Sequence, residues 1–186
     1  MPRIYESKIL ILATHGFEQS ELESPRDSLR DAGASVHIAS LDGEKIKGWD
    51  GDDWGREVAV DKALGDIDAS AYDAIVLPGG QINPDLLRVE KDVIALVKEF
   101  HDAGKPIAAI CHAPWILVEA DILKGRRATS YKSIETDVAN AGAEWVDEPV
   151  VSDHGIITSR NPGDLAAFSA KIVEEIEAGL QDRKAA

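Results

Sequence analysis

The sequence predicts a parallel α/β fold, in which helices cover both faces of a buried sheet. Three short runs are apolar almost throughout, as strands buried on both faces must be: 8–14 (KILILAT), 72–78 (YDAIVLP) and 107–110 (IAAI). Segments in which apolar residues recur at helical spacing alternate with these runs, as in parallel α/β proteins. At 186 residues the chain is most simply one domain, 1–186, with an end expected to fray over 183–186.

The first half of the chain predicts two strands, a helix and a surface excursion. After the strand at 8–14, a helix is expected over 18–32, ended by Gly33, and Pro25 is expected to kink or divide it. A second strand follows at 35–40. Residues 42–57 are rich in Gly and Asp, which predicts a surface loop or an irregular hairpin before a short return strand at 58–60. Trp49 and Trp54 in this segment are candidates for interface contacts.

The second half continues the alternation. After the strand at 72–78, Asn83 and Pro84 open a helix whose apolar stripe runs on to Phe100. The strand at 107–110 leads to an apolar helix, with Pro114 in its first turn, where a missing N–H costs nothing. Further elements are expected as short strands near 126–130, 144–147 and 150–159, a helix from about 133 to 142, and a closing helix that begins at 161–164 with Asn161 as its cap.

The charge, cysteine content and hydrophobic runs of the chain argue against several classes of function and location. The net charge of −14 argues against nucleic acid or an anionic membrane surface as a partner. A single cysteine excludes an intramolecular disulfide and suits a reducing compartment. The first residues lack signal-peptide organisation, and no run approaches the roughly 20 apolar residues that span a bilayer. We therefore expect a cytoplasmic protein.

Polar residues follow three of the predicted strands. Thr14-His15, Gly79-Gly80 and Cys111-His112 each come directly after an apolar run. Open parallel sheets bind ligands outside the carboxyl ends of their strands. These three pairs are therefore expected to meet at one rim of the sheet.

Cys111 lies between a strand and a helix, which is the arrangement of a nucleophile elbow. Such a tight turn needs small residues two positions away, and Ala109 and Ala113 stand there. The sulfur would lie at the positive end of the helix dipole, which favours the thiolate. Alternatively, Cys111 is a buried and inert core residue. His112 could act as a base or contribute mainly its backbone N–H.

Other groups could support this nucleophile. The N–H groups of Gly79, Gly80 and His112 are candidates for an oxyanion hole. Glu21, one turn into the helix after the first strand, could control the thiol proton, and Glu18 is its competitor; either could instead be a surface charge. No metal or nucleotide cofactor is expected, because the five histidines are scattered and no phosphate-binding motif is present.

Six segments spread over most of the chain carry recognisable motifs: LPGG (77–80), NPDLLR (83–88), GKPIAAICHAPW (104–115), LKGRRATSY (123–131), AGAEWVDEPVV (141–151) and ITSRNP (157–162). Together they closely resemble the PfpI family of the class I glutamine amidotransferase-like superfamily. The resemblance implies a flavodoxin-like three-layer sandwich, self-association as a homodimer or higher oligomer, and a cysteine-dependent site near a subunit interface.

The resemblance also implies roles for individual residues. Cys111 matches the family nucleophile, His112 its neighbouring histidine, and Glu21 the glutamate that hydrogen-bonds the thiol. In peptidase-like members an acid from the adjacent subunit completes the site, and the nearest match here is Asp85, one methylene shorter than Glu. Tyr131 stands where some relatives in the superfamily have a histidine, and it is a candidate substrate contact.

Three functions are compatible with this resemblance. The leading hypothesis is a cofactor-independent thiol enzyme that acts on reactive carbonyls or glycation adducts and protects against stress. The second is a redox-responsive protein whose Cys111 is oxidised. The third is an oligomeric intracellular cysteine peptidase, which the departure at Asp85 disfavours. The sequence does not decide between the first two.

Overall fold

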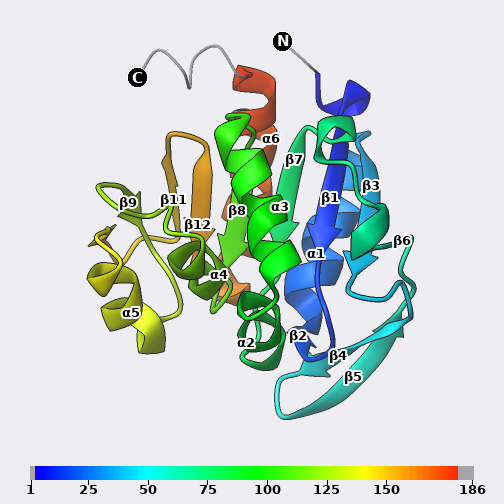
Figure 1. The fold of residues 1–186 in the computed structure, drawn as a ribbon, viewed down its shortest axis with the longest axis horizontal. Helices are drawn as coiled ribbons and strands as arrows, with labels where there is room; N and C mark the ends of the chain where they lie inside the picture. Colours follow the sequence, from blue (N-terminus) through cyan, green and yellow to red (C-terminus); the bar gives the residue numbers. More distant parts are fainter. Residues whose placement is uncertain (1–2, 180–186) are drawn as a thin grey trace.

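Seven strands form the central sheet of the protein, which the computed structural model describes over residues 3–179 (Figure 1). Neighbouring strands are parallel, except that the edge strand β11 runs antiparallel to β12. From one edge to the other the strands are β11 (Val150–Asp153), β12 (Ile156–Ser159), β8 (Ile107–Ile110), β7 (Ala74–Leu77), β1 (Lys8–Leu12), β3 (Ser35–Ser40) and β6 (Lys62–Ala63).

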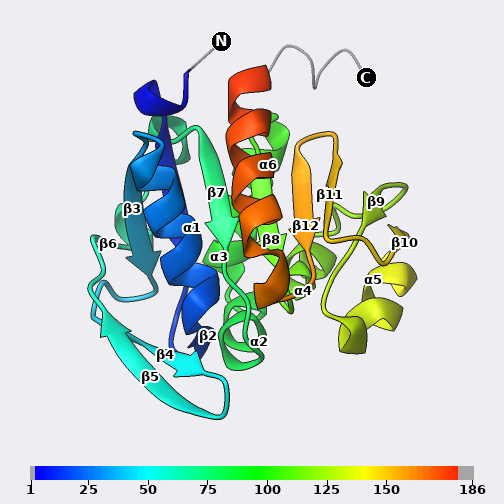
Figure 2. The same ribbon diagram turned by 180° about the vertical axis from the view of Figure 1, so that it is seen from behind.

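Helices cover both faces of this sheet. One face carries α3 (Lys91–Asp102) and α4 (Pro114–Glu119), and the other carries α1 (Gln19–Asp31) and α6 (Leu165–Ala178), as Figure 2 shows from behind. Successive side chains of β1 point to opposite faces of the sheet, so Leu10 packs into the hydrophobic core on one face and Ile11 into the core on the other. The predicted flavodoxin-like three-layer sandwich is confirmed.

Smaller elements extend the sandwich. A second sheet consists of β2 (Phe17–Glu18), β4 (Ile46–Asp50) and β5 (Asp53–Val58), so the predicted irregular hairpin is present. The remaining elements are α2 (Ile82–Arg88), the pair β9 (Arg127–Ala128) and β10 (Glu144–Trp145), α5 (Glu135–Asn140), and short 3₁₀ turns at Ile4–Glu6, Leu64–Asp66, Ala69–Ala71, Lys132–Ile134 and Pro162–Asp164.

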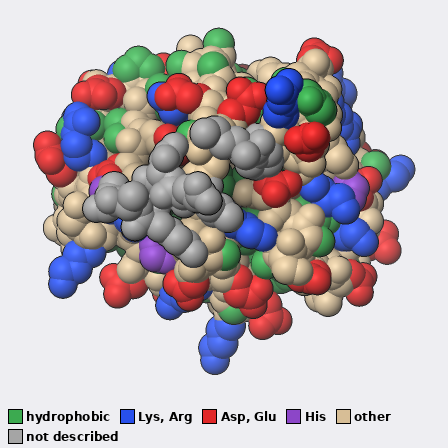
Figure 3. Space-filling view, turned by 90° about the horizontal axis from the view of Figure 1, so that it is seen from above, with side chains coloured by type: hydrophobic (Ala, Val, Ile, Leu, Met, Phe, Trp, Pro, Cys, Tyr) green, Lys and Arg blue, Asp and Glu red, His purple; other side chains and the backbone are tan. Residues whose placement is uncertain are grey.

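The two ends of the sheet differ in character. Its parallel strands point toward the lower edge of Figure 1, where α2 and the β4–β5 hairpin lie beyond their carboxyl ends. The opposite end carries acidic and basic side chains side by side (Figure 3). In residues 3–179 we find no helix with the length and apolar character needed to span a membrane.

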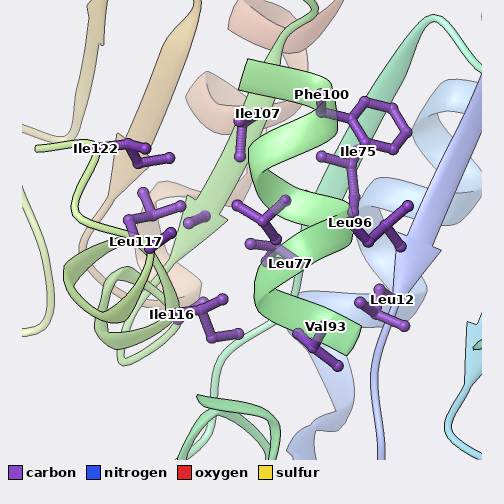
Figure 4. Packing of buried hydrophobic residues seen from close by; sticks show 14 of the residues in the cluster. Leu12, Ile75, Leu77, Val93, Leu96, Phe100, Ile107, Ile116, Leu117 and Ile122 are labelled. Carbon is purple, nitrogen blue, oxygen red and sulfur yellow. The ribbon is translucent and has the colours of Figure 1, made fainter. Parts of the chain in front are cut away.

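The core beneath α3 is formed by the stripe that the sequence predicted. Val93, Leu96 and Phe100 point from this helix onto the sheet, where they meet Ile75 and Leu77 of β7 (Figure 4). Val93, Val97 and Phe100 are fully buried, so this face of the helix is a packed contact and not a solvent-exposed one.

Several predicted elements are corrected. Pro25 does not divide its helix, since α1 is continuous from Gln19 to Asp31. Proline has no backbone N–H, so only one helical hydrogen bond is lost, the one that the Glu21 carbonyl would accept, and the ring of Pro25 is buried. The helix expected from Asn83 to Phe100 is two helices, because Glu90 has extended backbone angles that reorient the chain before α3. The return strand expected at 58–60 ends at Val58. The end expected to fray lies outside the described residues.

Asn83 joins two strand ends at the carboxyl rim. Its side chain is fully buried, and its Oδ1 accepts a hydrogen bond of 2.7 Å from the N–H of Thr14, after β1. Its Nδ2 donates to the carbonyl of Pro78, after β7, at 2.8 Å. Asn83 is therefore more than a residue that opens a helix, because it fixes the position of one turn against another.

Replacing Asn83 by Ala is expected to lower the free energy of unfolding by about 3 kcal/mol, because a buried N–H and a buried carbonyl lose their partner. Urea unfolding monitored by circular dichroism measures the change. Asn140→Ala, at the exposed end of α5, is the matched control and should change stability by less than about 0.5 kcal/mol. Equal effects of the two substitutions would contradict the role assigned to Asn83.

Candidate active site

Cys111 occupies a strained turn between β8 and α4. Its φ of 64° lies in the left-handed region, which residues with a side chain rarely adopt. The turn is held by hydrogen bonds from the Cys111 N–H to the Ser159 carbonyl and from the Ala113 N–H to the Ile110 carbonyl, both 3.0 Å long. Pro114 is the first residue of α4, as expected. The chain therefore adopts the nucleophile elbow that the sequence predicted.

Gly79 allows a carboxylate to approach this turn. A Cβ atom at Gly79 would lie 2.4 Å from Oε2 of Glu21 and 2.6 Å from Cβ of Cys111. Both distances are too short for any side chain, so the space between the strand end and the elbow exists only because residue 79 is glycine. Its N–H donates a 3.0 Å hydrogen bond to Oε2 of Glu21.

Glu21 is the carboxylate next to the thiol. The side chain is fully buried in α1. Burial, reinforced by the negative charge of Glu18, raises the pKa of Glu21 to about 8, while interactions with the Cys111 thiol and with the amides of Gly79 and Gly80 oppose the shift. Glu21 therefore keeps a proton through most of the neutral range, and it can act as an acid.

The thiol itself is not activated as the sequence predicted. Burial raises the pKa of Cys111, and the negative charge of Glu21 adds to the shift; the amides of Gly80 and His112 oppose it. The helix dipole has little influence because α4 has only six residues and begins three positions after the cysteine. Cys111 and Glu21 titrate as a coupled pair, and a thiolate forms most readily when Glu21 holds the proton.

The His112 side chain lies against the sulfur. Its Nδ1 is 3.1 Å from Sγ of Cys111, and its Nε2 is 3.1 Å from Oγ of Ser133. The ring stacks on Tyr131 and meets Trp115 edge-on, with centroid distances of 4.7 and 5.1 Å. Burial lowers the pKa of His112, so the imidazole is neutral at physiological pH and can accept a proton.

A cavity of about 650 Å³ opens above these groups. Gly79 is not among the residues that line the cavity, and its N–H is directed at Glu21. The backbone amides that face the sulfur of Cys111 are those of Gly80 and His112. The N–H of Gly79 was predicted to belong to an oxyanion hole, and this part of the prediction is wrong because that N–H binds Glu21 instead. The lining includes Glu18, Trp49, Gly80, Cys111, His112 and Tyr131.

Asp85 is not part of the cavity in its own chain. It lies on the exposed side of α2 and lines a separate depression with Ile82, Leu86 and Trp115. Its contribution to the site of another subunit stays a prediction. Among residues 3–179 no group of three or more His, Cys, Asp or Glu side chains could hold a metal ion.

Sequence reasoning missed Ser133 and Trp115, which flank the histidine. No motif marks Ser133: it follows His112 by 21 residues and reaches it only because the 3₁₀ turn Lys132–Ile134 lies next to the elbow. The hydrogen bond from the Tyr131 N–H to the Cys111 carbonyl, 2.8 Å long, holds this segment in place.

Comparison with known proteins identifies the family. The profile of the DJ-1/PfpI family matches residues 7–175 of the chain. The chain belongs to this family. The solved structure of Drosophila melanogaster DJ-1beta is similar to this chain, with a TM-score of 0.82 at 32% identity, and the match covers 92% of this chain and 94% of that chain.

Two curated relatives of this DJ-1/PfpI chain carry names that describe an activity. "Deglycase TK1284" of Thermococcus kodakarensis is 43% identical over 167 residues, which are 90% of this chain and 98% of the relative. "Protein/nucleic acid deglycase 2" of Escherichia coli is 42% identical over 164 residues, or 87% of this chain and 93% of the relative. The names support an enzymatic function of the deglycase type in the family.

The raised pKa of Glu21 has a measurable consequence for stability. The folded chain retains the proton up to about pH 8, whereas the unfolded chain releases it near the ordinary value of 4.5. The stabilising contribution of this proton is complete below pH 4.5 and is lost as the pH rises to about 8. Relative to Glu21→Gln, the wild type should therefore lose stability between pH 5 and 8, by up to roughly 4 kcal/mol.

Urea unfolding of wild type and Glu21→Gln at several pH values measures this difference. Subtracting the free energy of unfolding of the variant from that of the wild type removes the contributions of the other ionisable groups. Glu99→Gln, in an exposed position on α3, is the control and should show no such trend. A difference between wild type and Glu21→Gln that does not change with pH would show that Glu21 ionises normally.

Proposed function

We propose that this protein is a cofactor-independent, cysteine-dependent enzyme that acts on reactive carbonyls or on glycation adducts derived from them. The supporting observation is the group formed by Cys111, a proton-bearing Glu21 and a neutral His112 beside one cavity. These groups supply a nucleophile, an acid and a base. The proposal includes a role in stress protection and a cytoplasmic location, which suits a free cysteine.

Methylglyoxal illustrates the reaction. The Cys111 thiolate adds to the aldehyde carbon, and the carbonyl oxygen takes a proton from Glu21, which gives a hemithioacetal. His112 or the Glu21 carboxylate removes the hydrogen on that carbon and returns it to the neighbouring carbonyl carbon, while the hydroxyl proton moves to the second oxygen. The result is a thioester of lactic acid. Water hydrolyses the thioester and releases lactate and the thiol.

The amides of Gly80 and His112 are suited to the oxyanion that forms in two of these steps. They already face the sulfur, and donors fixed in advance stabilise a developing negative charge without reorganisation. A peptidase mechanism is less well supported, because the position beside Nε2 of His112, where an acid would stand, is occupied by Ser133. The redox hypothesis uses the same thiol and remains the alternative if no carbonyl is converted.

The first test is methylglyoxal consumption with lactate detection. The freshly reduced wild type should form lactate, and Cys111→Ala should lose the activity by at least about 10³-fold, because the chain has no second cysteine. Circular dichroism shows whether the variant is folded. Lactate formation that survives in folded Cys111→Ala would exclude this mechanism. No turnover in reduced wild type would favour the redox hypothesis, which the intact mass after mild peroxide then tests.

We further propose that the protein self-associates through α2. Ile82 and Leu86 of α2 and Val89, which follows its last residue, are 37, 45 and 72% exposed, so apolar side chains gather at the surface along this helix and its C-terminal end. Ile82 lines both the Cys111 cavity and the depression that contains Asp85. An interface on this helix would therefore bring Asp85 of one subunit near the site of another, as the family resemblance implies.

Light scattering after size-exclusion chromatography tests this proposal. Leu86→Lys should lower the molar mass of the main species at micromolar concentration, because a charge in an apolar interface is unfavourable. Tyr5→Lys, at an exposed apolar residue outside α2, is the matched control and should not change the mass. A wild type that is monomeric under these conditions would rule out any contribution of Asp85 across an interface.

A further inference from the structure

The cavity above Cys111 has charged side chains of one sign. Glu18 and Glu21 line it, and no lysine or arginine of residues 3–179 does so. Because Glu21 is buried and holds a proton in the neutral range, Glu18 is the group that supplies negative charge to the wall. His112 does not offset this charge, since burial keeps the imidazole neutral.

Glu18 is held in place and is not a free surface side chain. It is the last residue of β2 and the N-cap of α1, and its backbone N–H donates to the Gly79 carbonyl at 3.2 Å. Burial raises the pKa of Glu18 and the negative charge of Asp50 adds to the shift, while a hydrogen bond that the Glu18 carboxylate accepts from the backbone of Gly51, in the β4–β5 turn, favours the charged form. The carboxylate is thus fixed between two elements at the cavity wall.

Aromatic rings accompany this carboxylate. Trp49 pairs with Glu18 across the β2–β4 ladder and lines the same cavity, as does the exposed ring of Tyr131. The faces of aromatic rings attract cations, most strongly when the cation is partly removed from water. One fixed carboxylate with two aromatic rings is a combination that binds ammonium or guanidinium groups.

We propose that Glu18 determines substrate specificity, so that the cavity favours carbonyl compounds bearing an ammonium or guanidinium group over those bearing a carboxylate or phosphate. This inference rests on the proposed function and narrows its substrate class. A unit charge at the wall of a partly solvated cavity changes relative rates or affinities by roughly fivefold to tenfold. The same charge repels an acid product and promotes its release.

Cys111 allows the charge of the cavity to be measured without any turnover. It is the only cysteine of the chain, so a thiol reagent reports on this site alone. Two methanethiosulfonates differ mainly in charge, one with a trimethylammonium group and one with a sulfonate. Each forms a disulfide with the Cys111 sulfur and releases methanesulfinate. The ratio of their rate constants, divided by the ratio for 2-mercaptoethanol, gives the preference of the cavity.

The wild type should prefer the cationic reagent by roughly fivefold or more, and Glu18→Gln should reduce this preference at least threefold. Raising the salt concentration should also reduce the wild-type preference. Glu99→Gln removes one charge from an exposed position outside the cavity and should leave the ratio unchanged. An equal effect of the two variants would assign the preference to the net charge of −14, and a wild type without preference would overturn the inference.

Substituted phenylglyoxals extend the test to substrates. Phenylglyoxal, its 4-carboxylate and its 4-trimethylammonium derivative share one reacting group, and the products are the corresponding mandelates. The kcat/KM ratio of cationic to anionic substrate should exceed one and should fall in Glu18→Gln. Turnover of all three compounds at equal rates contradicts the specificity and leaves the proposed function intact. Failure to convert any of them contradicts the proposed function, while the thiol-reagent ratio still decides the charge preference.

Discussion

The close approach of Gly79 to Glu21 and Cys111 is the constraint on which the site depends. The N–H of Gly79 holds one carboxylate oxygen at 3.0 Å, and the missing side chain leaves room for that carboxylate beside the elbow. Three elements meet there: the end of β7, the first turn of α1 and the turn after β8. Any side chain at residue 79 would separate the acid from the thiol. Proton transfer between Glu21 and Cys111 therefore depends on the absence of a side chain at this position.

Burial then determines which state each group prefers. A carboxyl group removed from water is more stable when protonated, and so is a thiol, so Glu21 and Cys111 both resist ionisation. Their proximity means that one negative charge can be shared between them but two are strongly unfavourable. The reactive form, with thiolate and carboxylic acid, is therefore a minor tautomer of a singly charged pair. Its population depends on the amides of Gly80 and His112, which stabilise negative charge on sulfur.

The sequence predicted the parts of this site that local pattern encodes. Apolar runs marked β1, β7 and β8, and the small residues around Cys111 marked the elbow, whose φ of 64° agrees with a strained turn. Local pattern did not reveal which glycine amide serves Glu21, that Asn83 joins the ends of β1 and β7, or that Ser133 contacts His112. The contacts of Gly79 with Glu21, of Asn83 with Thr14 and of His112 with Ser133 join residues 58, 69 and 21 positions apart, and several residues of the same type could have made them. The expected preference of Cys111 for the thiolate was wrong, because the thiol is buried next to Glu21 and a local sequence pattern does not report burial.

Glu18 and Glu21, the two carboxylates of the cavity, have different roles because they are buried to different extents. Glu18 and Glu21 are three positions apart, which places both at the start of α1 on neighbouring parts of its surface. Glu21 is fully buried and holds a proton, whereas Glu18 is half-buried, close to Asp50 and bonded to the Gly51 backbone. The negative charge of Glu18 raises the pKa of Glu21, so ionised Glu18 helps to keep Glu21 protonated. A carboxylate that selects a cationic substrate at the wall would in this way also sustain the acid that donates a proton to the substrate. Binding of a cation next to Glu18 would weaken that influence, and the proton on Glu21 would then be released more readily at the moment when the bound carbonyl needs it.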